Sequence, residues 1–211
     1  MNLINLSELY TMVSAEAPGL NRASALDHIR EAARDFCDYS LVVQETIEDS
    51  IAIGDDTLTI RPSSSHLELK MVIGMETARG PIDSTTLAAL KQITGWRART
   101  GQVCKYVEQG DPGELRLYPI SSAAEDVQIR IAVVPSLSAT KIPKVLVTRH
   151  HSAIRSGALE RILGMSGQTW SNPAIAAMHA SKFNAAKSRA RAMANLDNGK
   201  TVLTTPRWRQ F

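Results

Sequence analysis

Two adjacent histidines, His150 and His151, are the residues best suited by type to bind a metal ion. Successive residues of an α-helix point about 100° apart, so the two imidazoles would not readily share one ion. No cysteine or carboxylate stands near them at the spacing of a zinc site. His151 falls on an apolar helix face, and we interpret it as an interior or interface histidine. We expect no metal site.

Paired carboxylates are the second kind of group that could do chemistry. Asp55-Asp56 and Glu125-Asp126 occur in segments of turn composition, where solvation explains them better than general acid–base catalysis. The sequence has no glycine loop for phosphates, no Gly-x-Ser-x-Gly elbow and no His-Glu-x-x-His helix. We therefore expect no enzyme, no catalytic residue and no cofactor.

Charge is distributed unevenly along the 211 residues. Residues 1–140 hold 12 Lys or Arg against 19 Asp or Glu, a formal charge of −7, whereas residues 141–211 hold 12 against 2, or +10. Such a basic third is suited to contact nucleic acid or acidic patches of a neighbouring subunit, and charge alone does not separate these partners. No run reaches the roughly 18 apolar residues of a membrane span, so no membrane contact is expected.

Helical spacing is strongest near the two ends of the chain. Apolar residues three or four apart, with capping residues and prolines at the expected places, predict four helices. They occupy residues 3–13, a stretch that Asn21 or Ser24 begins, residues 143–163, and a stretch that Ser171-Asn172-Pro173 begins. A short turn with two glycines joins the last two, so they should form a hairpin.

Between these helices the pattern changes to the alternation of strands. Alternating runs occupy residues 41–53, 57–60, 67–73, 103–107, 114–119 and 127–135. A break near Arg79-Gly80-Pro81 and a short helix from Asp83 or Ser84 to Ile93 interrupt them. We predict an α+β fold in which the terminal helices form a bundle, a central and mainly antiparallel β region protrudes, and the last residues form an extended arm.

The last predicted helix has small or apolar residues on two sides. One stripe consists of Ala176, Ala180, Phe183, Ala186, Ala190 and Met193. The opposite side, where a solvated helix would carry charges, holds Ala177, Ser181, Ala185, Ser188 and Ala192. We interpret these five as candidates for a subunit interface, although the preference of alanine for helices explains them equally well.

Several short segments of the sequence form an ordered set. They are Arg30 to Cys37, Leu115-Arg116-Leu117-Tyr118-Pro119, Ile142-Pro143, Ser156 to Leu163, Trp170-Ser171-Asn172-Pro173, and the basic aromatic carboxyl-terminal end. Taken together and in this order, they resemble the head-to-tail adaptor family of tailed phages. The resemblance covers nearly the whole chain and is close to the tail tubular protein A type of short-tailed phages. One departure follows Trp96-Arg97-Ala98-Arg99-Thr100-Gly101, where Gln102 stands at the place of an expected proline.

The resemblance implies a virion structural protein that assembles, from the host cytoplasm, into a usually twelvefold ring at the head-to-tail junction. The ring would join the portal protein to the next tail or nozzle component and let genomic DNA pass during ejection without sequence-specific contact. A bundle of residues 1–40 and 141–196 would lie near the portal, the β-rich residues 41–140 near the tail, and residues 197–211 would form a docking arm.

The arm would dock through its aromatic and basic side chains on the portal or on a neighbouring subunit. Trp208 and Phe211 would act as apolar anchors, and Arg207 and Arg209, with Lys200, as electrostatic partners. A frayed terminus is the other interpretation of this segment. A second hypothesis for the whole chain is a basic DNA-binding or packaging accessory protein that uses residues 141–211 and binds duplex with a steep dependence on salt.

Overall fold

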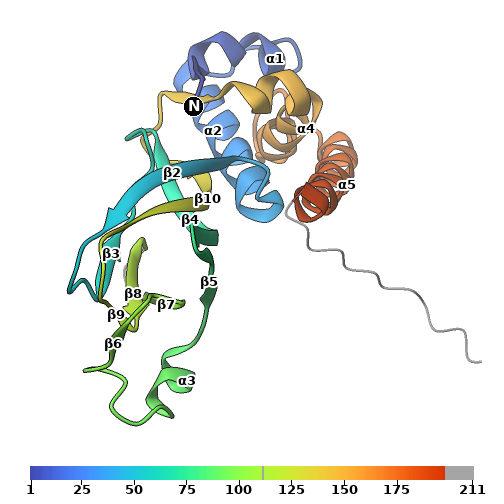
Figure 1. Ribbon diagram of the computed structural model, residues 1–211. Coiled ribbons are helices and arrows are strands. Elements are labelled where there is room, and N and C mark those ends of the chain that lie inside the picture. Colours follow the sequence, from blue (N-terminus) through green and yellow to red (C-terminus); the bar gives the residue numbers. More distant parts are fainter. Residues whose placement is uncertain (111, 198–211) are drawn as a thin grey trace, which may run out of the picture.

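Most of the helices lie together at one end of the molecule, and the principal sheet extends towards the other end, where the short helix α3 also lies (Figure 1). The computed structural model describes residues 1–110 and 112–197. Within them the principal sheet has seven strands in the order β2-β10-β4-β5-β7-β8-β3, and every neighbouring pair is antiparallel except β5 and β7. The predicted mixed α+β class is therefore confirmed.

The elements and their bounds are as follows in chain order. They are β1 (Leu3–Asn5), the 3-10 helix η1 (Leu6–Leu9), α1 (Thr11–Ser14), α2 (Arg22–Ser40), β2 (Gln44–Ile51), β3 (Thr57–Thr59), β4 (Leu67–Thr77), β5 (Gly80–Ser84), α3 (Leu87–Lys91), β6 (Thr100–Gly101), β7 (Lys105–Gln109), β8 (Glu114–Tyr118), β9 (Ile120–Ser121), β10 (Glu125–Pro135), β11 (Lys141–Pro143), α4 (Lys144–Leu163) and α5 (Pro173–Asp197). Two small pairs, β1 with β11 and β6 with β9, complete the set.

Capping residues define the first residues of α2 and α5, and a residue in a left-handed conformation ends α2. The side chain of Asn21 accepts a hydrogen bond from the backbone N–H of Ala23 at 2.8 Å and begins α2. Leu41 ends this helix in a left-handed conformation, with φ of 54°. Asn172 caps α5 in the same manner, because its side chain accepts the N–H of Ile175 at 3.2 Å.

Helices α2, α4 and α5 pack against one another and are called here the helix cluster. Its centre contains the fully buried side chains of Phe36 from α2, Ile154 from α4 and Phe183 from α5. Gly157 of α4 faces Phe183 so closely that a Cβ atom at this glycine would lie 2.7 Å from the ring. A glycine at this position therefore allows α4 and α5 to approach each other.

The sheet buries one face and exposes the other. On β10, the buried residues Val127, Ile129 and Ile131 alternate with exposed polar residues, because successive side chains of a strand point to opposite faces. A second, smaller apolar cluster lies at the end of the sheet away from the helices. It consists of Leu90, Val107 and Tyr118, with Ile93 and Trp96 packed against them.

Two local predictions were wrong. Residues 3–5 do not begin a helix but form β1, which pairs with β11 from the distant residues 141–143. Residues 80–84 form β5 instead of a break, so the next helix begins only at Leu87, with Thr86 as its cap. The partner of β1 is remote in sequence, whereas β5 forms a hairpin with the preceding strand β4 and also pairs with β7. In both places the apolar run is short and does not by itself show which structure it adopts.

The predicted arm, apart from Asp197 at the end of α5, lies outside the described residues. No helix in residues 1–110 and 112–197 carries an apolar stretch of the length and character that crossing a bilayer requires.

Candidate assembly surfaces

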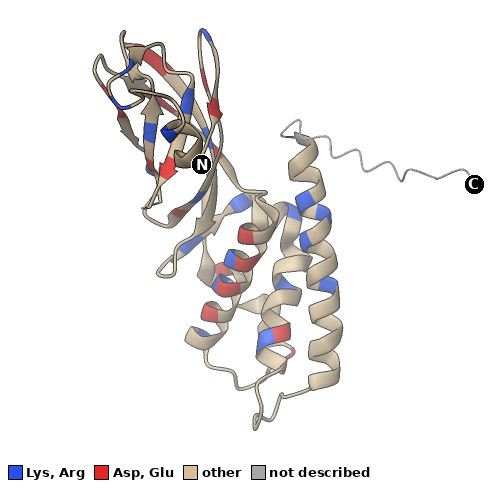
Figure 2. Cartoon of the chain, turned by 90° about the horizontal axis from the view of Figure 1, so that it is seen from below, with Lys and Arg blue, Asp and Glu red and all other residues tan. Residues whose placement is uncertain are grey.

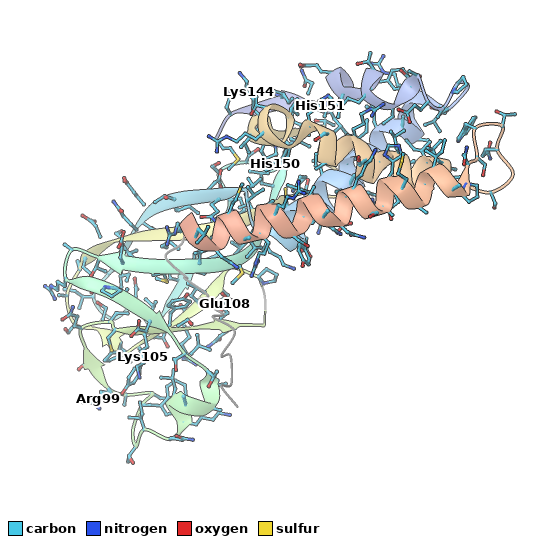
Figure 3. All side chains as sticks on the ribbon, turned by 90° about the vertical axis from the view of Figure 1, so that its right-hand side faces the viewer. Arg99, Lys105, Glu108, Lys144, His150 and His151 are labelled. Carbon is cyan, nitrogen blue, oxygen red and sulfur yellow. The ribbon has the colours of Figure 1, made fainter. Side chains whose placement is uncertain are left out.

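Helix α5 lies along the side of the helix cluster that faces the viewer in Figure 3. Its buried side consists of Ala176, His179, Phe183, Ala190 and Ala194. Met193, which the sequence pattern assigned to this side, is instead 63% exposed. Ala194 takes its place because eleven residues make about three helical turns, which returns the chain to the direction of Phe183.

The centre of the opposite side of α5 is exposed and carries no charged side chain. At about 100° per residue, seven residues lie within roughly 40° of the direction opposite Phe183, while Ala177 lies about 60° from it at one edge and the exposed Arg189 about 60° from it at the other. The seven residues and Ala177 are all exposed and uncharged, and we call them the α5 stripe: Ala174, Ala177, Met178, Ser181, Ala185, Ser188, Ala192 and Leu196. The five interface candidates Ala177, Ser181, Ala185, Ser188 and Ala192 are among them. Their role in a subunit contact stays a prediction.

Sequence reasoning missed the larger apolar members of this surface. Met178 is 46% exposed and Leu196 is 67% exposed, although both are apolar. A solvated helix normally places charged residues at the centre of its exposed side. Met178 and Leu196 point to about the same side of the helix as Ser181 and Ala185. A count at about 100° per residue could therefore have assigned them to this surface from the sequence.

Carboxylates of the amino-terminal third neutralise several cations of α4 and α5. Asp35 of α2 accepts hydrogen bonds from Lys187 at 3.1 Å and from Arg161 at 2.9 Å. Glu16 forms a salt bridge with Arg155. In Figure 2 the acidic residues of the helix cluster lie mainly along α2, next to the basic residues of its neighbours. The charge asymmetry along the sequence is therefore partly compensated within the fold.

A polar group with a buried serine and histidine joins two helices of the helix cluster to the segment after α1. Nδ1 of His179 lies 3.4 Å from Oγ of Ser156, and Nε2 of the same ring lies 3.6 Å from a carboxylate oxygen of Glu16. These residue types occur in hydrolytic triads, but Ser156 and His179 are only 7% and 5% exposed. Burial at this level keeps a substrate away from the serine, so we interpret the group as a link between α4, α5 and the segment after α1.

His151, which we interpreted as an interior or interface histidine, is exposed in the single chain, so it is not interior and its place in an interface stays a prediction. Its neighbour His150 is the half-buried one, and its ring centroid lies 4.9 Å from that of Phe36 (Figure 3). The reason is a kink: His150 has the non-helical angles φ −123° and ψ 18°, which shift the helical phase at this point.

His150 should make the folded state sensitive to mild acid. Burial, and then the charge of Arg149, lower the pKa of His150 below its ordinary 6.5. The folded state thus favours the neutral ring, so its stability is fully present above pH 6.5 and falls as pH drops through this value towards the folded pKa. We expect the His150→Gln variant to lose less thermal stability than the wild type between about pH 7 and about pH 5.

Thermal unfolding of both proteins across this pH range checks the expectation, and His151→Gln is the matched control because its ring is exposed. An unchanged pH dependence in His150→Gln would show that other groups cause the acid sensitivity.

The remaining predicted site residues belong to the predicted arm. Lys200, Arg207, Trp208, Arg209 and Phe211 lie outside the described residues. In the part of the chain that the structure describes, no three His, Cys, Asp or Glu side chains are grouped as metal ligands would be.

Comparison with known proteins connects the chain to a protein family. A family model described as SU10 adaptor protein matches residues 4–206 of the chain. The matched range begins within β1 and extends past the end of α5. No curated protein matches the chain.

Proposed function

Because this chain belongs to the SU10 adaptor protein family, a family of phage head-to-tail adaptors, we propose that it forms a ring between the portal protein and the tail. Family membership assigns it to the structural proteins of the virion, which are not a class of enzymes. The finer points of the proposal are a twelvefold ring of the tail tubular protein A type, assembled from the host cytoplasm, and a central channel through which the genome leaves the capsid.

The uncharged α5 stripe is the observation that carries this proposal. It extends along the whole described helix, and its exposed residues are small or apolar. Small side chains permit close approach of another helix, and Met178 and Leu196 supply apolar area at the two ends of the stripe. Depletion of charge is typical of the centre of protein interfaces. In a ring, this side of α5 would pack against the neighbouring subunit.

The separation of the long helices from the sheet supports a particular orientation of each subunit along the axis of the ring. We propose that the helix cluster, with residues 1–40 and 141–196, lies towards the portal, and that residues 41–140 lie towards the downstream tail component. Residues 197–211 would then reach the portal or a neighbour from the end of α5, with Trp208 and Phe211 as anchors and Lys200, Arg207 and Arg209 as electrostatic partners.

A DNA-binding protein that uses residues 141–211 is less well supported. Lys187, Arg161 and Arg155 are engaged by carboxylates of the same chain and are less available to phosphates. Lys182 and Arg189 are exposed, but they flank the uncharged stripe and do not form a continuous basic surface on α5.

Measurement of mass in a mixture of the chain and its portal protein tests the proposal. We expect a complex that exceeds the portal ring by a fixed multiple of the 23.0 kDa subunit, twelve in our proposal, also after nuclease treatment. A chain that stays monomeric with the portal, and yet binds duplex with a steep salt dependence, would favour the DNA-binding protein instead.

A further inference from the structure

A basic segment lies within the otherwise acidic residues 1–140. Between Asp83 and Glu108 the chain has no acidic residue but contains Lys91, Arg97, Arg99 and Lys105. Helix α3 and the turns after it project from the end of the sheet opposite the helices (Figure 1). Figure 3 places Arg99 at this far end and Glu108 nearer to the helix cluster. We call Lys91, Arg97 and Arg99 the basic tip.

The backbone of the basic tip is fixed by packing and hydrogen bonds. The smaller apolar cluster around Leu90, Tyr118 and Trp96 holds α3 and the following turns on β7 and β8. The N–H of Trp96 donates to the carbonyl of Ile93 at 3.2 Å. The carbonyl of Arg99 accepts the N–H of Ile120 at 3.0 Å. The chain thus presents these cations on an ordered platform.

The cations of the basic tip are exposed and available. Lys91, Arg97 and Arg99 form no salt bridge with any carboxylate in residues 1–110 and 112–197. The guanidinium of Arg97 lies 5.3 Å from the centre of the Trp96 ring, which holds it by a cation–π interaction.

Carboxylates beside this platform are already engaged. The guanidinium of Arg116 also lies 5.4 Å from the centre of the Trp96 ring. It forms a 2.7 Å salt bridge with Asp56, so this carboxylate already has a cationic partner. The carboxylate of Asp55 accepts the N–H of Ala52 at 2.7 Å. Lys105 is left out of the basic tip because it stands opposite the exposed Asp83 in the pairing of β5 with β7.

We propose that the basic tip contacts the phosphate backbone of duplex DNA without reading its sequence. Phosphate contact requires only accessible cations, whereas a stable protein partner also requires apolar anchors at the centre of the interface. Among the described residues 84–101, Leu87 is the most exposed large apolar side chain, and it is only 38% exposed. The basic tip therefore suits a polyanion better than a protein surface.

This inference rests on the proposed function in one respect, because only a ring brings several basic tips to the same DNA and so provides avidity. A single tip offers three cations and binds weakly, whereas a ring repeats the tip around DNA in its channel and raises the effective concentration of each contact. Contacts of this type are independent of sequence, as passage of a whole genome requires. They depend strongly on salt because cations bound to the phosphates are released.

Binding of the full chain to a short fluorescent duplex, measured across a salt series, tests the inference. The variant Lys91→Gln/Arg97→Gln/Arg99→Gln should bind at least about tenfold more weakly at low salt, and its slope of log K against log salt should be shallower by about 2 to 3. The matched control Lys141→Gln/Lys144→Gln/Arg149→Gln removes three exposed cations near the beginning of α4 and should bind as the wild type does.

Three results would overturn the inference. They are absence of duplex binding by the wild type at low salt, unchanged binding by the tip variant, and an equal loss in the control, which would show an effect of net charge alone. If the tip variant binds DNA as the wild type does but no longer binds the downstream tail protein, the basic tip contacts an acidic protein surface and not DNA. Ring formation with the portal, measured on the same proteins, tests the proposed function separately, because the tip variant should still form the ring.

Discussion

Replacement of Ser181 and Ala185 by arginine is expected to abolish ring assembly and to leave the monomer folded. Both positions lie at the centre of the α5 stripe and are exposed in the single chain. Arginine is a good helix former, so the free energy of unfolding of the monomer should change by no more than about 0.5 kcal/mol. In a helix contact between subunits, an unpaired buried charge costs about 3–5 kcal/mol, which weakens each contact at least about a hundredfold.

Mass measurement with the portal, together with circular dichroism and thermal unfolding, checks this result. Thr148→Arg/Ser152→Arg is the matched control, because it places the same two side chains four residues apart on exposed positions of α4. The control should assemble like the wild type. Assembly of the Ser181→Arg/Ala185→Arg variant into the same ring would show that the stripe faces no neighbour.

Replacement of Gly157 by valine is expected to lower the free energy of unfolding by about 3 kcal/mol. A Cβ atom at this position would lie 2.7 to 3.0 Å from three carbons of the Phe183 ring. This ring is 1% exposed and has Phe36 beside it at a centroid distance of 6.2 Å, so it cannot move aside freely. The more favourable helix propensity of valine, a few tenths of a kcal/mol over glycine, does not offset the overlap.

Denaturant unfolding measures this change, and a second substitution tests its cause. In a Phe183→Leu background the ring is absent, so Gly157→Val should cost less than it does in the wild type. Gly74→Ala is a control, because nothing lies within 4 Å of a Cβ atom at Gly74. Equal costs of Gly157→Val in both backgrounds would mean that the contact with Phe183 does not set the spacing of α4 and α5.

The long helices were predictable because their signals are local. Asn21 caps α2, Asn172 caps α5 and Pro173 begins α5, and each of these features can be recognised within a few residues of sequence. The alternation of β10 is equally local. The pairing of β1 with β11, and the parallel neighbours β5 and β7, join segments that are distant along the chain, and no period in a single sequence encodes them.

The errors in side-chain placement have a similar physical origin. His151 was assigned to the inner side of α4 by an uninterrupted helical count, but the kink at His150 shifts the phase. Met193 was assigned to the inner side of α5 by a spacing of three, whereas Ala194 continues the face that Phe183 and Ala190 define.

The candidate surfaces were predictable only in part. The exposed small residues of α5 follow from helical phase, so the sequence indicated them. The neutralisation of Lys187 and Arg161 by Asp35 does not, because α2 and α5 are distant in sequence and meet only in the fold. That the basic tip forms no salt bridge within residues 1–110 and 112–197 also depends on the fold, since Arg116 of β8 engages Asp56.

A reconstruction of the adaptor–portal assembly by electron cryo-microscopy tests the central claim most directly. The account predicts a closed ring beneath the portal in which Ser181, Ala185 and Ser188 of each α5 contact the neighbouring subunit. A closed ring in which this stripe faces solvent, or a preparation in which the chain remains monomeric beside the portal, would contradict it.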